Sequence, residues 1–177
     1  MTADRDGATE PRRISFVLNE IPVTVWALPH QTLMEVLREE LGATEVKYGC
    51  GEGVCGTCTV LLDGDTVNAC LLFAVQAEGA RITTLKGLAP AGQDLHSLQE
   101  SFLEHGGSQC GFCTPGMLLA AFEALRDRPG ISREEIRDAL SGNLCRCTGY
   151  TKIVDAVAAV ALTGTMPGHA PDGAGER

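Results

Sequence analysis

Residues 49–58 read GCGEGVCGTC, and this stretch decides how the N-terminal half of the chain folds. Its three cysteines have the spacing C-x4-C-x2-C, and a fourth cysteine follows after eleven further residues. This is the plant-type ferredoxin spacing for a [2Fe–2S] cluster. The interleaved glycines permit positive φ angles, so backbone N–H groups can point at the thiolates. A zinc site is the alternative, but zinc sites more often combine two C-x2-C-like pairs. We therefore predict a plant-type [2Fe–2S] cluster on four cysteines: Cys50, Cys55, Cys58 and Cys70.

A second set of four cysteines lies in the C-terminal half, with the spacing C-x2-C, thirty-one residues, then C-x-C. Both pairs stand close to expected helix N-termini, where free N–H groups and the helix dipole suit an anionic thiolate cluster. The spacing alone fits either a four-cysteine zinc site or a second cluster. Disulfides are disfavoured, because some cysteines are only one or two residues apart and no export signal precedes them. The set comprises Cys110, Cys113, Cys145 and Cys147.

The composition excludes several classes of protein. The 177 residues carry a net charge of −9, which argues against nucleic-acid binding because that function needs clustered Lys and Arg. No apolar run reaches the roughly 18 residues that span a bilayer. The first 13 residues contain no apolar segment of the kind found in signal peptides. We therefore expect a cytoplasmic protein with neither a membrane span nor a nucleic-acid partner.

The N-terminal half has the pattern of a strand pair, a helix, a loop and a second strand pair. Thr32 and Glu35 form a capping-box signature, and Gly42 ends the helical stripe that follows. Asp63-Gly64-Asp65 is a hairpin signal. This order predicts a β-grasp domain, with Trp26 in its core. The expected strands are residues 14–18, 23–27, 59–62, 66–69 and 81–84.

The C-terminal half has helical periodicity. Pro115 suits the first turn of a helix, and Ser132 with Glu135 forms a second capping-box signature. Four helices with short connections predict a small four-helix bundle, which makes the fold class α+β. The predicted organisation is a flexible tail (1–12), a ferredoxin-like domain (13–88), a helical domain (89–162) and a second flexible tail (163–177).

Three motifs resemble the iron–sulfur subunit of the xanthine dehydrogenase (molybdenum hydroxylase) family: residues 49–58, residues 109–116 (QCGFCTPG) and residues 142–150 (GNLCRCTGY). The resemblance covers about residues 13–161. It implies a plant ferredoxin-like β-grasp domain followed by a four-helix bundle with its own [2Fe–2S] cluster. The resemblance therefore favours a second cluster over a zinc site on the second set of cysteines. Thr57 departs from many relatives, which carry alanine there, but it is not a ligand position. The chain stops after this module, as in bacterial relatives built from separate subunits.

The resemblance also implies the function of an electron-transfer subunit in an oxidoreductase complex, with no catalytic residue of its own. A large partner subunit is expected to hold a molybdenum–pterin cofactor, and a medium subunit is expected to hold FAD. Electrons from molybdenum would pass through both clusters to FAD or another acceptor. Gln109 matches a glutamine that hydrogen-bonds the pterin, and Cys147 matches the cysteine nearest the pterin. A solvent-facing or helix-capping role is the alternative for Gln109.

Two further kinds of protein are compatible with the cysteine pattern. A free-standing two-cluster ferredoxin would use the acidic charge for electrostatic steering, and a zinc-bound structural module would be colourless. Arg146 either offsets cluster charge or forms a surface salt bridge, and Lys47 with Tyr48 either faces a flavin subunit or solvent. The Val46-Lys47 approach to the first loop is similar to bacterial purine hydroxylases, which favours a purine or another N-heterocycle as the substrate of the complex.

Overall fold

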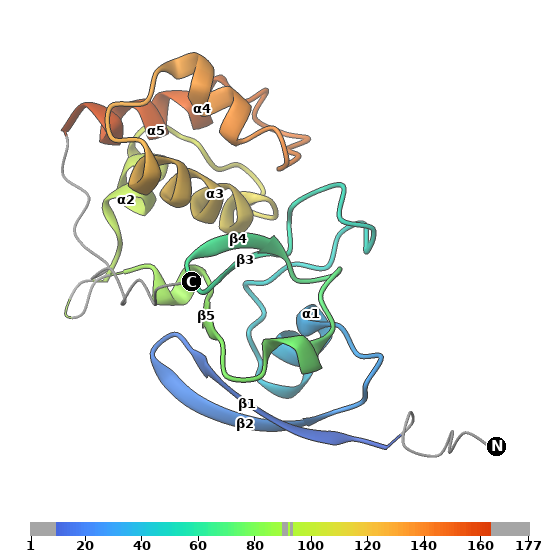
Figure 1. Ribbon diagram of the computed structural model, residues 1–177. Helices are drawn as coiled ribbons and strands as arrows, with labels where there is room; N and C mark the ends of the chain where they lie inside the picture. The colour runs from blue at the N-terminus through green and yellow to red at the C-terminus, as the bar shows by residue number, and fades with distance from the viewer. Residues whose placement is uncertain (1–9, 90–91, 93, 164–177) are drawn as a thin grey trace.

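The computed structural model describes residues 10–89, 92 and 94–163, and its N-terminal half is a five-stranded mixed sheet (Figure 1). The strand order is β2-β1-β5-β3-β4, in which β1 and β5 run parallel and all other neighbours run antiparallel. Apolar side chains of the sheet and of the helix against it form one core. The strands are β1 (Arg12–Leu18), β2 (Ile21–Ala27), β3 (Thr59–Leu62), β4 (Asp65–Asn68) and β5 (Arg81–Thr83).

Both hairpins of this sheet close through two-residue turns with positive φ angles. Asn19 and Glu20 have φ angles of 48° and 67°, and Asp63 and Gly64 have φ angles of 51° and 96°. Positive φ at both central residues matches the twist of the flanking strands. Both predicted strand pairs are therefore formed as hairpins, and the second turns at the predicted Asp63-Gly64 signal.

The helix of the N-terminal half begins at the predicted cap. The Thr32 hydroxyl accepts from Glu35 N at 3.2 Å, and Thr32 N donates to Glu35 Oε2 at 2.7 Å. After α1 (Leu33–Glu35) the chain continues as a π-helical segment, η2 (Val36–Glu40), in which Leu41 N reaches the Val36 carbonyl oxygen. The sequence pattern predicted the helix but not this wider winding. Two 3₁₀ segments follow later, η3 (Ala74–Ala77) and η4 (Leu85–Gly87).

The C-terminal half is helical and has a core of its own. Helix α2 packs on α3 and α5, and α4 also packs on α3 and α5. The predicted Ser132–Glu135 capping box opens α4. The helices are α2 (Ser97–Glu104), α3 (Thr114–Asp127), α4 (Arg133–Ala139) and α5 (Thr151–Thr163). Most of both predicted tails lies outside the described residues, and β1 already begins at Arg12.

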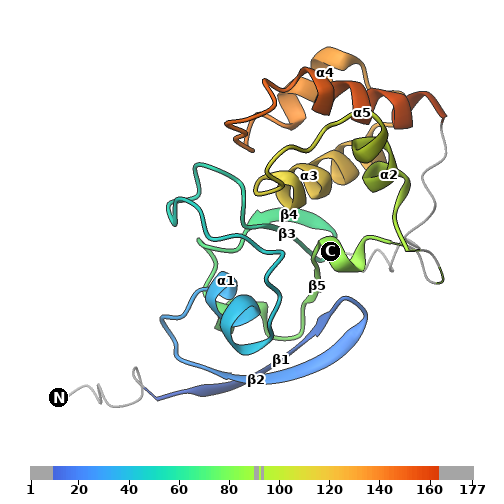
Figure 2. The ribbon, with the colours of Figure 1, turned by 180° about the vertical axis from the view of Figure 1, so that it is seen from behind.

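Helix α3 joins the two halves by lying against β3 and β4, as both ribbon views show (Figures 1 and 2). Successive strand residues face opposite sides, so Val60 enters the sheet core while Leu61 enters the helical core. Glu123 of α3 accepts hydrogen bonds from Thr66 N and Thr66 Oγ1 at 2.6 and 2.7 Å. The sheet and the helices are thus held in contact by both apolar and polar groups.

Trp26 corrects one prediction. Its side chain is 65% exposed, because it stands on the outer face of the edge strand β2, opposite Arg13 of β1. The neighbouring positions Val25 and Ala27 supply the core instead. Within the described residues, no helix is long and apolar enough to cross a membrane.

Candidate metal centres

The first set of cysteines lies in the loop between η2 and β3, with its fourth member directly after β4. The N–H groups of Glu52 and Val54 point at Cys50 Sγ, at 3.4 and 3.3 Å. The surrounding hydrogen bonds lower the pKa of Cys50 to about 6, and the largest contribution comes from the Glu52 N–H. Gly51 and Gly53 have φ angles of 71° and 73°, which lets the loop turn its amides inward as the glycine pattern predicted.

The thiols of this set meet as two pairs. Cys50 contacts Cys55, and Cys58 contacts Cys70. The first pair is half-buried, whereas the second pair is buried in the core of the sheet domain. Burial raises the pKa of Cys58 to about 12. A metal must therefore displace the proton before Cys58 can serve as a thiolate ligand.

The second set joins the loop before α3 to the loop before α5. The sulfur atoms of Cys110 and Cys147 lie 3.5 Å apart, and Cys113 contacts Cys145. Tetrahedral coordination with metal–sulfur bonds of about 2.3 Å places two thiolates about 3.8 Å apart. The Cys110–Cys147 separation therefore fits two ligands of one metal atom. Cys113 is the buried N-cap residue of α3, and burial raises its pKa to about 12.

Each set offers the donors of a two-iron cluster. Among the described residues, no group of three or more His, Cys, Asp or Glu side chains is placed to hold a metal ion. The thiols gather instead as two contacting pairs in each set, and a [2Fe–2S] cluster needs four thiolates, two on each iron. The inward-pointing amides around Cys50 suit the negative charge of such a cluster.

Two threonine hydroxyls, which no sequence motif marks as functional, also touch the thiols. Thr57 Oγ1 lies 3.2 Å from Cys55 Sγ. Thr148 Oγ1 lies 3.1 Å from Cys145 Sγ, and Thr148 N donates to the same sulfur at 3.4 Å. Burial opposes the effect, but the hydroxyl and N–H of Thr148 lower the pKa of Cys145. Each set thus has one cysteine sulfur in contact with a threonine hydroxyl.

The cyan and orange cysteine loops lie side by side in both ribbon views (Figures 1 and 2), and hydrogen bonds connect them. Leu144 N donates to the Cys55 carbonyl oxygen at 2.9 Å. The buried side chain of Asn143 donates through Nδ2 to the Gly56 carbonyl oxygen at 2.8 Å and to Thr59 Oγ1 at 3.3 Å. Sequence reasoning missed Asn143, because nothing local connects it to a loop 87 residues away.

Two glycines let the first turn of α3 approach the place where the two cysteine loops meet. A β-carbon at Gly116, in the first turn of α3, would lie 2.2 Å from the Gly56 carbonyl oxygen. A β-carbon at Gly56 would lie 2.4 Å from the Gly142 carbonyl oxygen. Both approaches are closer than any side chain permits, so the backbones of the two cysteine loops and α3 are in contact here.

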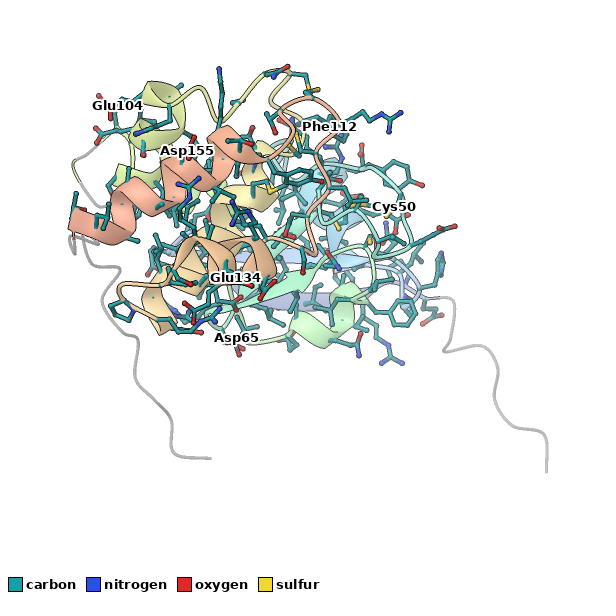
Figure 3. All side chains as sticks on the ribbon, turned by 90° about the horizontal axis from the view of Figure 1, so that it is seen from above. Cys50, Asp65, Glu104, Phe112, Glu134 and Asp155 are labelled. Atoms are coloured by element: carbon teal, nitrogen blue, oxygen red, sulfur yellow. The ribbon has the colours of Figure 1, made fainter. Side chains whose placement is uncertain are left out.

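Gln109 is exposed beside the exposed cysteines of the second set, Cys110 and Cys147. It does not cap α3, because the N-cap residue of that helix is Cys113. The neighbouring apolar side chains Phe112 and Leu144 are also exposed. Seen from above, Phe112 lies on the same side of the molecule as Cys50 of the first set, away from Glu104 at the end of α2 (Figure 3).

A second group of exposed apolar side chains surrounds the first loop: Tyr48, Val54 and Leu71. Tyr48 lies against Gly51, and Leu71 lies against Gly53, so both cover the loop glycines while staying open to solvent. Exposed apolar side chains that gather in one region are a feature of interaction surfaces. Each cysteine set therefore stands beside its own apolar surface.

Two domain families match the chain. Residues 16–84 match a family described as a 2Fe–2S iron–sulfur cluster binding domain, and residues 84–158 match one described as a [2Fe–2S] binding domain. The chain is 49% identical over 144 residues to the nicotinate dehydrogenase small FeS subunit of Eubacterium barkeri, covering 81% of this chain and 91% of the relative. It is 45% identical over 152 residues to the xanthine dehydrogenase iron–sulfur-binding subunit of Escherichia coli O157:H7, covering 84% and 94%.

A solved structure gives the same result. Quinoline 2-oxidoreductase from Pseudomonas putida 86 has a chain that superposes on this one with a TM-score of 0.83 and 47% sequence identity. The match covers 88% of this chain and 97% of the other. Both the sheet half and the helical half thus have counterparts in one polypeptide of that enzyme.

Proposed function

Because the chain belongs to the iron–sulfur subunits of the xanthine dehydrogenase (molybdenum hydroxylase) family, we propose that it relays electrons within a multi-subunit molybdenum hydroxylase. It carries two [2Fe–2S] binding domains. Electrons from a molybdenum–pterin centre would pass singly through the two clusters to FAD or another acceptor. The cofactors supply the redox chemistry, and the residues of this chain hold and orient them.

We assign the ligands in two groups of four. The plant-type cluster takes Cys50, Cys55, Cys58 and Cys70, and the second cluster takes Cys110, Cys113, Cys145 and Cys147. The thiol contacts within each set support this division. We interpret residues 13–88 as the ferredoxin-like domain and residues 89–162 as a four-helix bundle, because each half buries a core of its own.

The hydrogen bond from Leu144 N to the Cys55 carbonyl oxygen carries the relay proposal. Cys55 is a ligand of the first set, and Leu144 is covalently bonded to Cys145, a ligand of the second set. One hydrogen bond and otherwise covalent bonds thus connect the two ligand sets. Electron tunnelling weakens steeply across empty space, so a bonded route of this kind favours transfer between the clusters.

The molybdenum–pterin partner belongs beside the second cluster in this proposal. The exposed Gln109 amide is free to hydrogen-bond a pterin, and Cys147 is an exposed ligand next to it. Phe112 and Leu144 provide apolar surface for a large subunit. A medium, FAD-binding subunit belongs at the other apolar surface, formed by Tyr48, Val54 and Leu71 beside the plant-type cluster.

The substrate is determined by the partner that holds molybdenum. The names of the relatives include nicotinate, xanthine and quinoline, which are all nitrogen heterocycles. We therefore propose an N-heterocycle as the substrate of the complex. A cytoplasmic location accords with eight cysteines kept as thiols for metal binding.

Purification of the untagged protein from its own cells tests this function. We expect it to elute with a large and a medium subunit, and the complex to contain molybdenum and about four irons for each copy of this chain. Rapid freezing after addition of an N-heterocyclic substrate should show both clusters reduced by EPR. Elution as a monomer with full electron-carrier activity would support a free-standing ferredoxin instead, and a colourless protein with stoichiometric zinc would exclude both.

A further inference from the structure

We propose that the Thr57 hydroxyl donates a hydrogen bond to the Cys55 thiolate and thereby raises the reduction potential of the plant-type cluster. Thr57 Oγ1 lies 3.2 Å from Cys55 Sγ, well within the range of a hydrogen bond to sulfur. A cysteine bonded to iron has lost its S–H proton, so only the threonine hydroxyl can be the donor. This inference rests on the proposed function only in taking Cys55 as a cluster ligand.

The surroundings of the hydroxyl favour this hydrogen bond. Thr57 is only 5% exposed, so water does not compete for the hydroxyl. Its other acceptor is the Lys47 carbonyl oxygen, at a longer 3.4 Å. An anionic sulfur is a stronger acceptor than a neutral carbonyl oxygen. With iron bound, the hydroxyl proton therefore points to the sulfur.

Gly49 fixes the hydroxyl against the sulfur. A β-carbon at Gly49 would lie 2.6 Å from Thr57 Oγ1 and 2.8 Å from Cys55 Sγ, so the bare glycine backbone closes over both atoms. On the other side, Lys47 N donates to the Thr57 carbonyl oxygen at 3.2 Å. The threonine is thus held at both its backbone and its side chain. If the hydroxyl rotated away from the sulfur, no water would be present to replace the lost hydrogen bond, because the side chain is buried.

The effect on the cluster follows from charge. Reduction adds one electron to the cluster and its thiolates, so a donor that touches a thiolate stabilises the reduced form more than the oxidised form. The low dielectric of a buried site strengthens this preference. The hydroxyl keeps its proton when one electron enters or leaves, so no atom is transferred. The reduced state of the plant-type cluster is therefore more stable than it would be without the hydroxyl.

The position of Cys55 gives the effect a direction. Cys55 is the ligand whose carbonyl oxygen accepts from Leu144 N, so the hydroxyl acts where the two cluster loops meet. Without this hydroxyl the potential at this end would be lower, so an electron would pass less readily from the second cluster toward the acceptor side. Thr148 places a corresponding hydroxyl on Cys145 of the second set, at 3.1 Å, which provides a matched control on the other cluster.

The test is an EPR-monitored redox titration of the purified complex with Thr57→Val, Thr57→Ala and Thr57→Ser. Valine and alanine remove the hydroxyl, whereas serine keeps it. We expect Val and Ala to lower the midpoint potential of the plant-type cluster and Ser to match the wild type, with the second cluster unchanged in all three. The expected size is a tenfold change in the one-electron equilibrium between the clusters, which corresponds to about 59 mV. Thr148→Val should lower only the potential of the second cluster.

Iron content and the EPR signals of both clusters are measured first, and they test the ligand assignment separately from the potential. If valine does not fit beside Gly49 and the cluster is lost, the comparison of alanine with serine decides. A plant-type cluster that is fully assembled in Thr57→Ala and titrates at the wild-type potential would overturn the proposal. An equal shift in Thr57→Ser would also overturn it, because packing rather than the hydroxyl would then be the cause.

Discussion

The backbone N–H of Leu144 donates to the carbonyl oxygen of Cys55 at 2.9 Å, and this contact joins two loops that carry cysteines of different sets. The contact does not stand alone. Asn143 precedes Leu144 in the chain, and Gly56 follows Cys55. The side chain of Asn143 donates to the carbonyl oxygen of Gly56. Two adjacent residues of one loop thus bind two adjacent residues of the other, which holds the cysteines of the two loops at a defined distance and orientation.

Asn143→Ala is expected to loosen this junction. The substitution removes both hydrogen bonds of the buried amide, while the Gly56 carbonyl oxygen still accepts from Thr59 N and Thr59 Oγ1. At about 0.5–1.5 kcal/mol for each lost hydrogen bond, we expect the free energy of unfolding to fall by about 1–3 kcal/mol. Urea unfolding should show this loss, and the magnetic coupling between the reduced clusters should change in EPR spectra. The matched control is Asn68→Ala, whose amide donates to Gly53 in the first loop but not across the junction. A cluster coupling that changed equally in both variants would contradict a specific role for Asn143.

Gly116→Ala is expected to be destabilising although alanine is the better helix former. Alanine gains about 1 kcal/mol in helix propensity over glycine, but its β-carbon would lie 2.2 Å from the Gly56 carbonyl oxygen. Since both sides of this contact are backbone, neither can move without displacing a cysteine loop. Thermal unfolding of the holo-protein should show a lower midpoint. Gly142→Ala, at the same junction but with open space around its β-carbon, should be neutral or slightly stabilising.

Local signals in the sequence predicted the helices and strands, but they did not predict the contact between the two cysteine loops. Thr32 with Glu35 and Ser132 with Glu135 mark helix starts within four residues of chain, and both caps form. The contact of Asn143 with Gly56 spans 87 residues and leaves no periodic or local pattern. Residue type alone predicts Trp26 in the core, whereas its position on the outer face of an edge strand leaves it exposed. The cysteine spacing predicted two sets of four, and thiols within each set are in contact in the structure. The contacts of Thr57 and Thr148 with the thiols depend on side-chain geometry, which the spacing does not show.

Substitution of one ligand in each set should damage only its own cluster. Cys55→Ser retains the carbonyl oxygen that accepts from Leu144, so the junction stays intact while the plant-type cluster loses a thiolate. Cys113→Ser should do the same to the second cluster. Iron analysis is expected to fall from about four to about two irons per chain in each variant, with one EPR signal retained. If either substitution erased both signals in a folded protein, the division into four and four ligands would be wrong.

Glu45 is expected to make the stability of the sheet domain depend on pH. Burial acts to raise its pKa, but the Thr84 hydroxyl at 2.7 Å, the Glu45 backbone N–H and Lys86 at 3.1 Å outweigh it and lower the pKa below 4.5. A lowered folded-state pKa stabilises the protein above the unfolded value, and this stabilisation is lost as the pH falls through the folded value. The unfolding midpoint of wild type minus that of Glu45→Gln should therefore shrink as the pH is lowered from 6 toward 4 and below.

The control for this pH dependence is Glu39→Gln. Glu39 is an exposed acid that lies 3.7 Å from Arg38, and exposed ion pairs of this kind contribute little to stability. Its difference from the wild type should be small and nearly constant across the same pH range. Since any acid-induced loss of a cluster affects all variants alike, it cancels when each variant is compared with wild type at the same pH. A difference for Glu45→Gln that stayed constant with pH would rule out the proposed titration.

Gln109→Ala is expected to slow electron transfer from the molybdenum–pterin centre without disturbing either cluster. The exposed Gln109 amide is neither a metal ligand nor the cap of α3, so its removal leaves the helices and thiols as they are. If the amide binds the pterin in the complex, its loss leaves a buried polar group unsatisfied, at a cost of about 1–3 kcal/mol. Stopped-flow bleaching of the iron–sulfur absorbance by substrate should then be slower, while reduction by dithionite stays at the wild-type rate.

Gln109→Glu separates the hydrogen-bonding role of this side chain from its size. Glutamate keeps the length of glutamine but replaces the donating NH₂ group by an acceptor oxygen. If Gln109 donates to the pterin, the Glu variant should be slowed at least as much as the Ala variant, because it adds a repelling charge as well as losing the donor. If Gln109 serves only as an accepting or space-filling group, the Glu variant should bleach at the wild-type rate while the Ala variant is slowed. Wild-type bleaching in both variants, with molybdenum fully retained, would place Gln109 outside the pterin site altogether.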